Sequence, residues 1–120
     1  MVAERAFRTE PSELSDDEID RVFHALAAAT RRDILRRTIE REQSVSTLAS
    51  GYEMSFAAVQ KHVGVLEAAG LIVKRAEGRE RLVRADPAMI ARARALLARY
   101  EDLWRARIDR LDALLAEPED

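Results

Sequence analysis

The fold of this chain is decided by Met54-Ser-Phe-Ala-Ala-Val-Gln-Lys-His-Val-Gly-Val-Leu-Glu-Ala-Ala-Gly70. At helical spacing this stretch has a mostly apolar stripe of Val59, His62, Val63 and Leu66. The opposite stripe is thin and polar, with Ala57, Gln60, Lys61 and Gly64. Ser55 can cap the start of the helix and Gly70 can end it. A short helix with such an outer face fits the major groove of DNA, so the stretch predicts a recognition helix.

A two-stranded pattern follows this predicted helix. Residues 71–75 and 81–85 read as strands, with residues 76–78 as the turn between them. Gly78 supplies the positive φ that such a turn requires. Arg79 and Arg81 lie at or near the tip, where arginines are simply solvated in most proteins. Beside a recognition helix we expect them to reach a phosphate or the minor groove. The two elements together predict a winged helix-turn-helix.

Composition limits the classes of protein that this chain can be. Its 120 residues are enough for one domain with a modest core. The absence of cysteine excludes disulfides and thiolate zinc sites. Residues 1–14 are charged, unlike a signal sequence, and no segment approaches the roughly 18 apolar residues of a membrane span. We expect a cytoplasmic protein without membrane attachment, with a flexible N-terminal extension at 1–14 and one domain at 15–120.

The net charge of −2 is unevenly distributed along the chain. Residues 55–84 carry six lysines and arginines against three glutamates. The first twenty residues carry seven acids against two arginines, and the last twenty carry seven against three. Attraction to phosphate depends on the local field, so one basic face is enough for DNA binding by a mildly acidic protein.

Three helices are predicted before the recognition helix. The first begins at Ser15, with Glu18 completing a capping box, and carries an apolar stripe. Thr30 caps the second, from Arg31, and Ser46 caps a short third helix. The apolar stripe of the first helix consists of Ile19, Val22, Phe23 and Leu26, and the side chains expected to face inward on the second helix are Ile34, Leu35 and Ile39.

A long final helix is predicted over residues 86–117, with Asp86 as its cap and Pro87 in its first turn. At 1.5 Å per residue it is about 45 Å long, longer than the domain that carries it. Its apolar seam has the spacing of a coiled coil and consists of Ile90, Ala93, Leu97, Tyr100, Trp104, Ile108, Leu111 and Leu115. The seam could pair with the first helix of the same chain or with a second chain, and we expect both. The predicted dimer interface comprises Phe23, Ile90, Leu97, Tyr100, Trp104, Ile108 and Leu111.

Three segments, Val22–Leu35, Ser44–Ala49 and residues 55–72, resemble the ArsR family of bacterial transcription repressors. The resemblance covers roughly residues 16–116. It implies a winged-helix homodimer with the first and last helices at its interface. It also implies operator binding near a regulated promoter, with release by a metal or another signal. The residues at the family's DNA-reading places are Phe56, Ala57, Gln60 and Lys61.

The chain departs from the metal-sensing members of that family. Where the founding members carry a cysteine pair, this chain has Ser44 and Ser46. No histidine follows His62, and the usual Asp-Pro before the second helix is Ala28-Ala29 here. The chain is therefore similar to the metal-independent branch. We expect no metal and no cofactor, and an unidentified small-molecule or protein effector.

Two alternatives stay open for His62, which either packs within the domain or contacts a phosphate from the edge of the groove. The predicted DNA-binding residues are Ser55, Phe56, Ala57, Gln60, Lys61, His62, Arg79 and Arg81. The predicted function is a sequence-specific regulator, a repressor acting as a homodimer on a palindromic double-stranded operator. The alternative is a protein-interaction module that dimerises without DNA. An enzyme is not expected, because no nucleophile, phosphate-binding loop or paired-carboxylate cleft accompanies the histidines.

Overall fold

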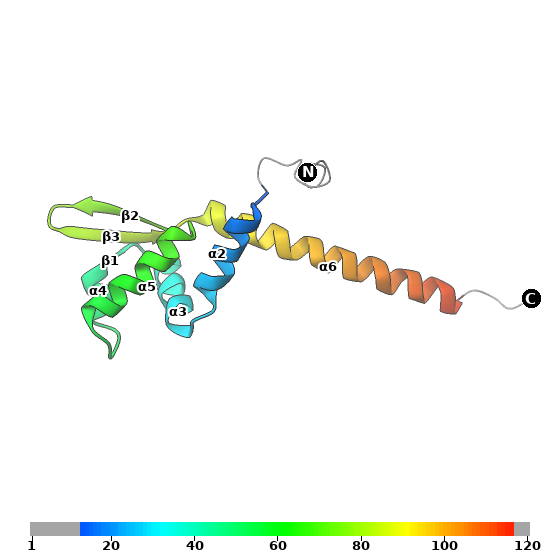
Figure 1. Cartoon of the computed structure of the whole chain (residues 1–120), viewed down its shortest axis with the longest axis horizontal. Helices are drawn as coiled ribbons and strands as arrows, with labels where there is room; N and C mark the ends of the chain where they lie inside the picture. The colour runs from blue at the N-terminus through cyan, green and yellow to red at the C-terminus, as the bar shows by residue number, and fades with distance from the viewer. Residues whose placement is uncertain (1–12, 117–120) are drawn as a thin grey trace, which may run out of the picture.

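The computed structural model describes residues 13–116, whose helices and strands are arranged around one core (Figure 1). Their order is α2 (Asp16–Leu26), α3 (Ala29–Glu40), β1 (Gln43–Ser44), α4 (Val45–Ala49), α5 (Phe56–Ala68), β2 (Ile72–Glu77), β3 (Glu80–Ala85) and α6 (Pro87–Ala116). The hairpin of β2 and β3 lies at one end of the domain, and α6 extends away from the other end. Most of the predicted flexible extension, at 1–12, lies outside the described residues.

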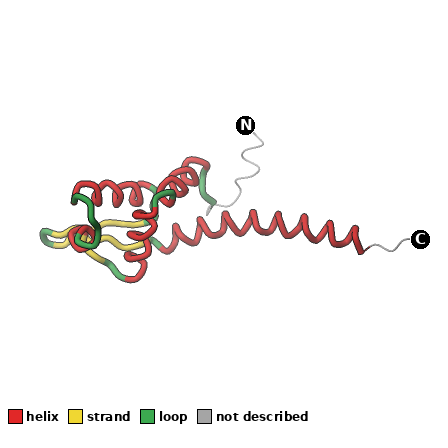
Figure 2. Tube along the Cα trace, turned by 90° about the horizontal axis from the view of Figure 1, so that it is seen from below, coloured by secondary structure: helices red, strands yellow, loops and turns green. Residues whose placement is uncertain are grey.

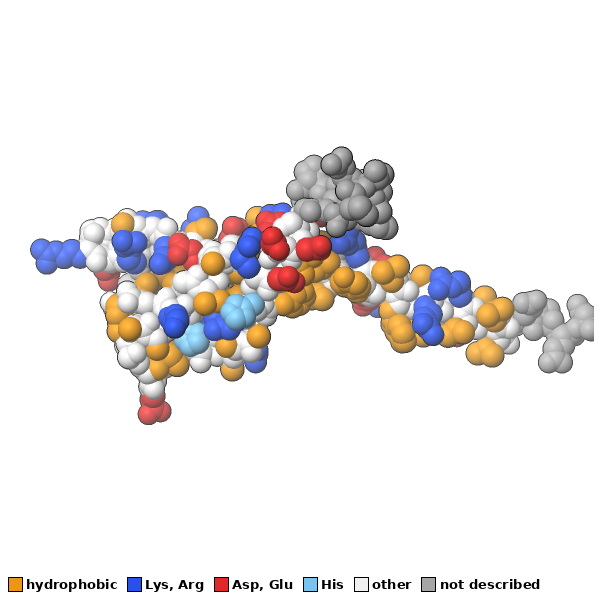
Figure 3. Space-filling model, viewed as in Figure 1, with side chains coloured by type: hydrophobic (Ala, Val, Ile, Leu, Met, Phe, Trp, Pro, Cys, Tyr) orange, Lys and Arg blue, Asp and Glu red, His pale blue; other side chains and the backbone are white. Residues whose placement is uncertain are grey.

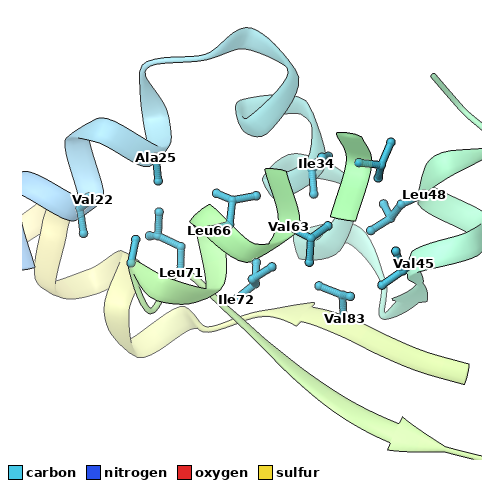
Figure 4. Close-up of a cluster of buried hydrophobic side chains, with 12 residues drawn as sticks. Val22, Ala25, Ile34, Val45, Leu48, Val63, Leu66, Leu71, Ile72 and Val83 are labelled. Atoms are coloured by element: carbon cyan, nitrogen blue, oxygen red, sulfur yellow. The ribbon is translucent and has the colours of Figure 1, made fainter. Parts of the chain in front are cut away.

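The core lies between the helices and one face of the small sheet (Figure 4). Its largest fully buried side chains are Val22, Ile34, Leu48, Val59, Val63, Leu66, Leu71, Ile72 and Val83. The three valine and leucine positions of the predicted apolar stripe on α5 are all among them. His62, the fourth position of that stripe, is only partly buried.

One side chain that was predicted to face inward lies at the surface. Ile39 is 59% exposed, because Thr38 takes the buried position one turn after Ile34. The Thr38 hydroxyl is satisfied there by donating to the Leu35 carbonyl at 2.9 Å. On α2, Phe23, which is predicted to lie in the dimer interface, is 44% exposed, and Ala25 is fully buried.

The predicted capping box starts α2. The Ser15 backbone N–H donates to Glu18 Oε1 at 2.7 Å, and the Glu18 N–H donates to Ser15 Oγ at 3.1 Å. The backbone hydrogen bond from Ser15 holds the pKa of Glu18 below its usual value. Local sequence chemistry alone therefore places this helix end correctly.

The predicted caps of the next two helices are wrong. Thr30 lies inside α3, which begins at Ala29 after Ala28, and no side chain caps this end. The cap of α4 is Ser44 rather than Ser46, and its Oγ accepts from the Thr47 N–H at 3.0 Å. The reason lies in the sheet, because Ser44 is held in an extended conformation by pairing with β3 and the helix follows at once.

The wing is a three-stranded antiparallel sheet in the order β1-β3-β2, one strand more than the predicted hairpin. The added strand pairs Gln43 with Val83 and Ser44 with Leu82. The two longer strands pair as far as Glu77 and Glu80, beyond the predicted ends. Gly78 has the expected positive φ, at 62°, so the turn is tight and the arginine after it lies at the tip.

The first third of α6 packs on the domain, and Asp86 caps it by accepting from the Ala88 N–H at 3.0 Å. Met89, Ile90 and Ala93 lie against the core, and Leu96 is buried. The packing also includes two residues that were predicted to belong to the flexible extension: Leu14 is buried, and Glu13 accepts a hydrogen bond from Arg99 at 2.6 Å. No helix between residues 13 and 116 is long and apolar enough to cross a membrane.

Gly70 and Gly64 give opposite predictions for alanine substitution. Gly70 ends α5 with φ at 77°, and an added Cβ would lie 2.8 Å from Met89 Cε. Because an L side chain is strained there, Gly70→Ala should lower the free energy of unfolding by about 1–2 kcal/mol. Gly64 lies inside α5 with no atom within 4 Å of a new Cβ. Gly64→Ala should raise the free energy of unfolding by about 0.5–1 kcal/mol.

Urea unfolding of the two variants and the unmodified protein, followed by helical circular dichroism, measures both changes. Equal stability of the two variants would contradict the strain assigned to Gly70.

Candidate nucleic-acid interface

The N-terminal half of α5 presents an exposed face. Ser55 caps the helix, its Oγ accepting from the Ala58 N–H at 3.1 Å. Phe56 is 47% exposed, and Ala57, Gln60 and Lys61 are exposed as well. The buried stripe on the other side of the helix keeps these four side chains pointing away from the core. The face offers one aromatic ring, one methyl, one amide and one cation to a ligand.

The turn before α5 is fixed to α3 by a polar network that the sequence did not predict. The Tyr52 hydroxyl donates to Asp33 Oδ2 at 2.6 Å. Arg37 lies over the Tyr52 ring, 5.3 Å from its centroid, and donates to the Leu48 carbonyl at 3.2 Å. The hydrogen bonds from Tyr52 and Arg36 lower the pKa of Asp33, and burial raises the pKa of Tyr52. Two elements of the helix-turn-helix are thereby held in one orientation.

Ion pairing divides the cations of the wing into two groups. Arg75 pairs with Glu42 at 2.8 Å and with Glu77 at 2.7 Å, and its pKa is raised by these carboxylates. Arg79 and Arg81 are exposed and form no ion pair with any acid of residues 13–116. The two arginines predicted to contact DNA are therefore among the wing cations that form no ion pair within residues 13–116, and Arg84 is another.

A groove of about 420 Å³ runs between α5 and the wing. Four of the predicted site residues line it: Phe56 and Gln60 from the helix, and Arg79 and Arg81 from the hairpin. Ala57 and Lys61 lie on the same exposed part of α5 but do not line the groove. Basic side chains extend over the hairpin to its tip, whereas acidic ones gather near α2 (Figure 3). The structure thus brings residues from two separate segments to one surface, whose other charged lining residues are Lys74 and Glu80.

His62 is partly buried and turned towards α3 rather than towards the groove. Its Nδ1 lies 3.1 Å from Nη1 of Arg31, in the first turn of α3. This contact supports the packing interpretation of His62. Arg31 was not singled out by the sequence, because the two residues are 31 positions apart.

The predicted dimer residues form a second exposed surface, which is apolar. Beyond Arg99, whose side chain contacts Glu13, α6 extends away from the rest of the domain (Figure 2). The exposed members of the predicted set are Phe23, Leu97, Tyr100, Trp104, Ile108 and Leu111. Ile90 differs, because it lies partly buried against the core of its own chain.

Candidate metal ligands do not cluster in the part of the chain that the structure describes. No group of three or more histidine, cysteine, aspartate or glutamate side chains between residues 13 and 116 could hold an ion. Ser44, at one of the family's cysteine places, is buried and used as a helix cap. Metal independence itself stays a prediction.

Comparison with known proteins finds regulators with this architecture. Residues 26–75 match a family described as a helix-turn-helix domain. The HTH-type transcriptional regulator Rv2034 of Mycobacterium tuberculosis is 37% identical over 81 residues, which are 68% of this chain and 76% of that protein.

Solved structures match over most of the described chain. An ArsR-like transcriptional regulator from Rhodococcus sp. RHA1 has a TM-score of 0.73 at 33% identity, covering 86% of this chain and 96% of that one. The homodimeric winged helix-turn-helix DNA-binding domain of a Mycobacterium bovis protein has a TM-score of 0.59 at 28% identity, covering 74% and 88%.

Proposed function

Because the chain belongs to the ArsR family of winged helix-turn-helix transcriptional regulators, we propose that it is a repressor that binds a palindromic operator as a homodimer. Its relatives are regulators of transcription and not enzymes. The observation that carries the proposal is the groove surface between α5 and the wing. There an exposed amide and aromatic ring lie next to two arginines that no acid of residues 13–116 neutralises.

The two parts of this surface have different tasks. Gln60 carries a donor and an acceptor on one amide, which match the N6 and N7 edge of adenine in the major groove. Phe56 and Ala57 can contact a thymine methyl group. Arg79 and Arg81, at and next to the wing tip, reach phosphates or the minor groove beside the recognition helix. The arginines supply affinity, and the helix supplies sequence preference. We place the protein in the cytoplasm, where its DNA partner is.

The second copy is proposed to cover the apolar face of α6. A single helix with Leu97, Trp104, Ile108 and Leu111 in water exposes more apolar surface than its own domain can bury. The α6 helix of a second copy can pack its own apolar seam against this one, with the two helices related by a two-fold axis. Phe23 of α2 lies exposed on the domain, so α2 joins the proposed interface.

The signal that releases DNA is proposed not to be a transition metal. The chain offers no thiolate, and its two histidines lie on separate helices, His24 on α2 and His62 on α5. His62 also faces an arginine, which disfavours a cation at that nitrogen. An unidentified small molecule or protein is the proposed effector. The alternative function, a dimer that binds another protein without DNA, would leave the unpaired wing arginines without a role.

DNA binding tests the proposed function directly. We expect the purified chain to retard duplex DNA from its own upstream region and to protect a site with dyad symmetry. The two recognition helices should contact half-sites about one turn, roughly 34–36 Å, apart. Affinity should fall steeply between low and physiological salt, because arginines and lysines displace counterions. A footprint without symmetry would contradict the two-fold mode, and no retardation at low salt would favour the protein-interaction module.

Gln60 and Lys61 should differ in what they contribute. Gln60→Ala should relax preference at one base pair of each half-site, losing about 1–3 kcal/mol there, because the bidentate contact to adenine is gone. If Lys61 contacts a phosphate, Lys61→Ala should weaken binding to all DNA sequences equally. It should also reduce the salt slope, the slope of log affinity against log salt concentration, by about one. Binding to a randomised half-site library measures both. Identical base preferences for Gln60→Ala and the unmodified protein would remove Gln60 as a base reader.

The homodimer should depend on one face of α6. Trp104→Glu should weaken dimerisation by about 3 kcal/mol or more, roughly a hundredfold in Kd, because it removes a large ring and buries a charge. Ala106→Glu places the same charge two positions further on, on the opposite side of the helix, and should leave the dimer intact. Sedimentation equilibrium at micromolar concentration measures both variants. A monomeric unmodified protein, or equal effects of the two substitutions, would contradict the proposed interface.

A further inference from the structure

Arg31 joins three elements of the domain through one guanidinium. Its Nε donates to the Ala25 carbonyl at 2.8 Å, and its Nη2 donates to the His24 carbonyl at 3.0 Å. Both carbonyls belong to the last turn of α2, where backbone oxygens lack the regular helical partner four residues on, although the His24 carbonyl also accepts from the Ala27 N–H at 3.2 Å. Its Nη1 lies 3.1 Å from Nδ1 of His62 on α5. Arg31 itself lies on α3, so α2, α3 and α5 meet at this side chain.

The contact between Arg31 and His62 determines which nitrogen of the neutral imidazole carries the proton. A guanidinium keeps its protons and can only donate, so Nδ1 of His62 has to accept. In a neutral imidazole the single proton is then on Nε2. The hydrogen bond therefore selects one of the two tautomers, and it is directional because the planar guanidinium is already held by two carbonyls.

The position of His62 makes this contact relevant to the groove surface. His62 follows Lys61 directly and lies within α5, whose outer face carries Gln60. The buried stripe fixes the tilt of α5 mainly by apolar packing, which tolerates small rotations. A directional hydrogen bond at the edge of that stripe restricts rotation of the helix about its axis.

We propose that Arg31 is a positioning residue for the recognition helix, holding α5 to the end of α2 through the Nε2–H tautomer of His62. This inference rests on the proposed function of α5 in DNA recognition. Arg31 acts through His62 and not by touching DNA. Because α2 also carries Phe23 of the proposed dimer interface, Arg31 connects the helix of that interface with the recognition helix α5.

Arg32 provides a matched control for Arg31. It is the next residue, carries the same charge and donates to the Leu26 carbonyl at 2.7 Å, so it also satisfies the end of α2. This contact does not involve α5. Arg31→Met and Arg32→Met therefore remove the same charge and contacts to the end of α2, two for Arg31 and one for Arg32, but only the first removes the link to the recognition helix.

The first experiment compares operator affinity of these two variants across salt concentrations, together with their thermal unfolding. Arg31→Met should weaken binding by about tenfold, and Arg32→Met by less than about threefold, because only the former frees α5. The salt slope should be the same for Arg31→Met and the unmodified protein, since no phosphate contact is lost. A slope reduced by about one would show that Arg31 binds phosphate, and would overturn the positioning role.

The second experiment observes the imidazole in the free protein. Nitrogen-15 NMR of labelled histidine should show His62 as the Nε2–H tautomer in the unmodified protein and in Arg32→Met. In Arg31→Met the two tautomers should be mixed. A mixture in the unmodified protein would overturn the proposal without any DNA. Failure of the unmodified protein to bind DNA would instead contradict the proposed function, leaving the tautomer result to judge the contact.

Substitution of His62 completes the test from the other side of the hydrogen bond. His62→Gln keeps an oxygen that can accept from Arg31, and should bind the operator within about threefold of the unmodified protein. His62→Leu has no acceptor and should bind about tenfold more weakly. Combining Arg31→Met with His62→Leu should cost no more than either alone, because both remove the same contact. Additive losses would show that the two residues act independently and would overturn the proposal.

Discussion

Burial of Val59, Val63 and Leu66 decides which side of α5 is turned towards the core, because all three side chains are at most 1% exposed. Helical geometry then decides which residues face outward. Gln60 and Lys61 are exposed for the same reason that their neighbours are buried. The exposure of the amide and the aromatic ring at the groove, and the distance of both from the wing, depend on this packing. A change that loosened the core would therefore alter the proposed DNA-contacting face without removing any polar contact.

Electrostatics in the wing follow from the register of its strands. The pairing of β2 with β3 and the position of Glu42 before β1 give Arg75 two carboxylate partners. Arg79 and Arg81, at and after the turn, form no ion pair with an acid of residues 13–116. The sheet thereby separates structural cations from available ones, although both kinds lie within a few residues of each other. Net charge hides this separation, since the sum over the chain is slightly negative.

The sequence predicted those features that local chemistry decides. Ser55 and Gly70 mark the ends of α5 because a hydroxyl cap and a positive φ are requirements of single residues. Prediction from the sequence failed where contacts between distant segments decide the structure. Two serines near α4 are locally equivalent, and only pairing with β3 selects Ser44. The contact of Arg31 with His62 leaves no signal in either segment, so sequence reasoning kept both interpretations of the histidine. Exposure of Ile39 likewise depends on where α3 packs, which periodicity alone does not determine.

The projecting part of α6 also affects how the protein moves through water. A helix of 30 residues, most of it beyond the domain, makes the particle elongated rather than round. Friction on an elongated particle exceeds that on a sphere of equal mass. Such a chain leaves a gel-filtration column early, at the volume of a larger globular protein. Elution volume on its own would therefore overstate its mass, whether it travels singly or as a pair.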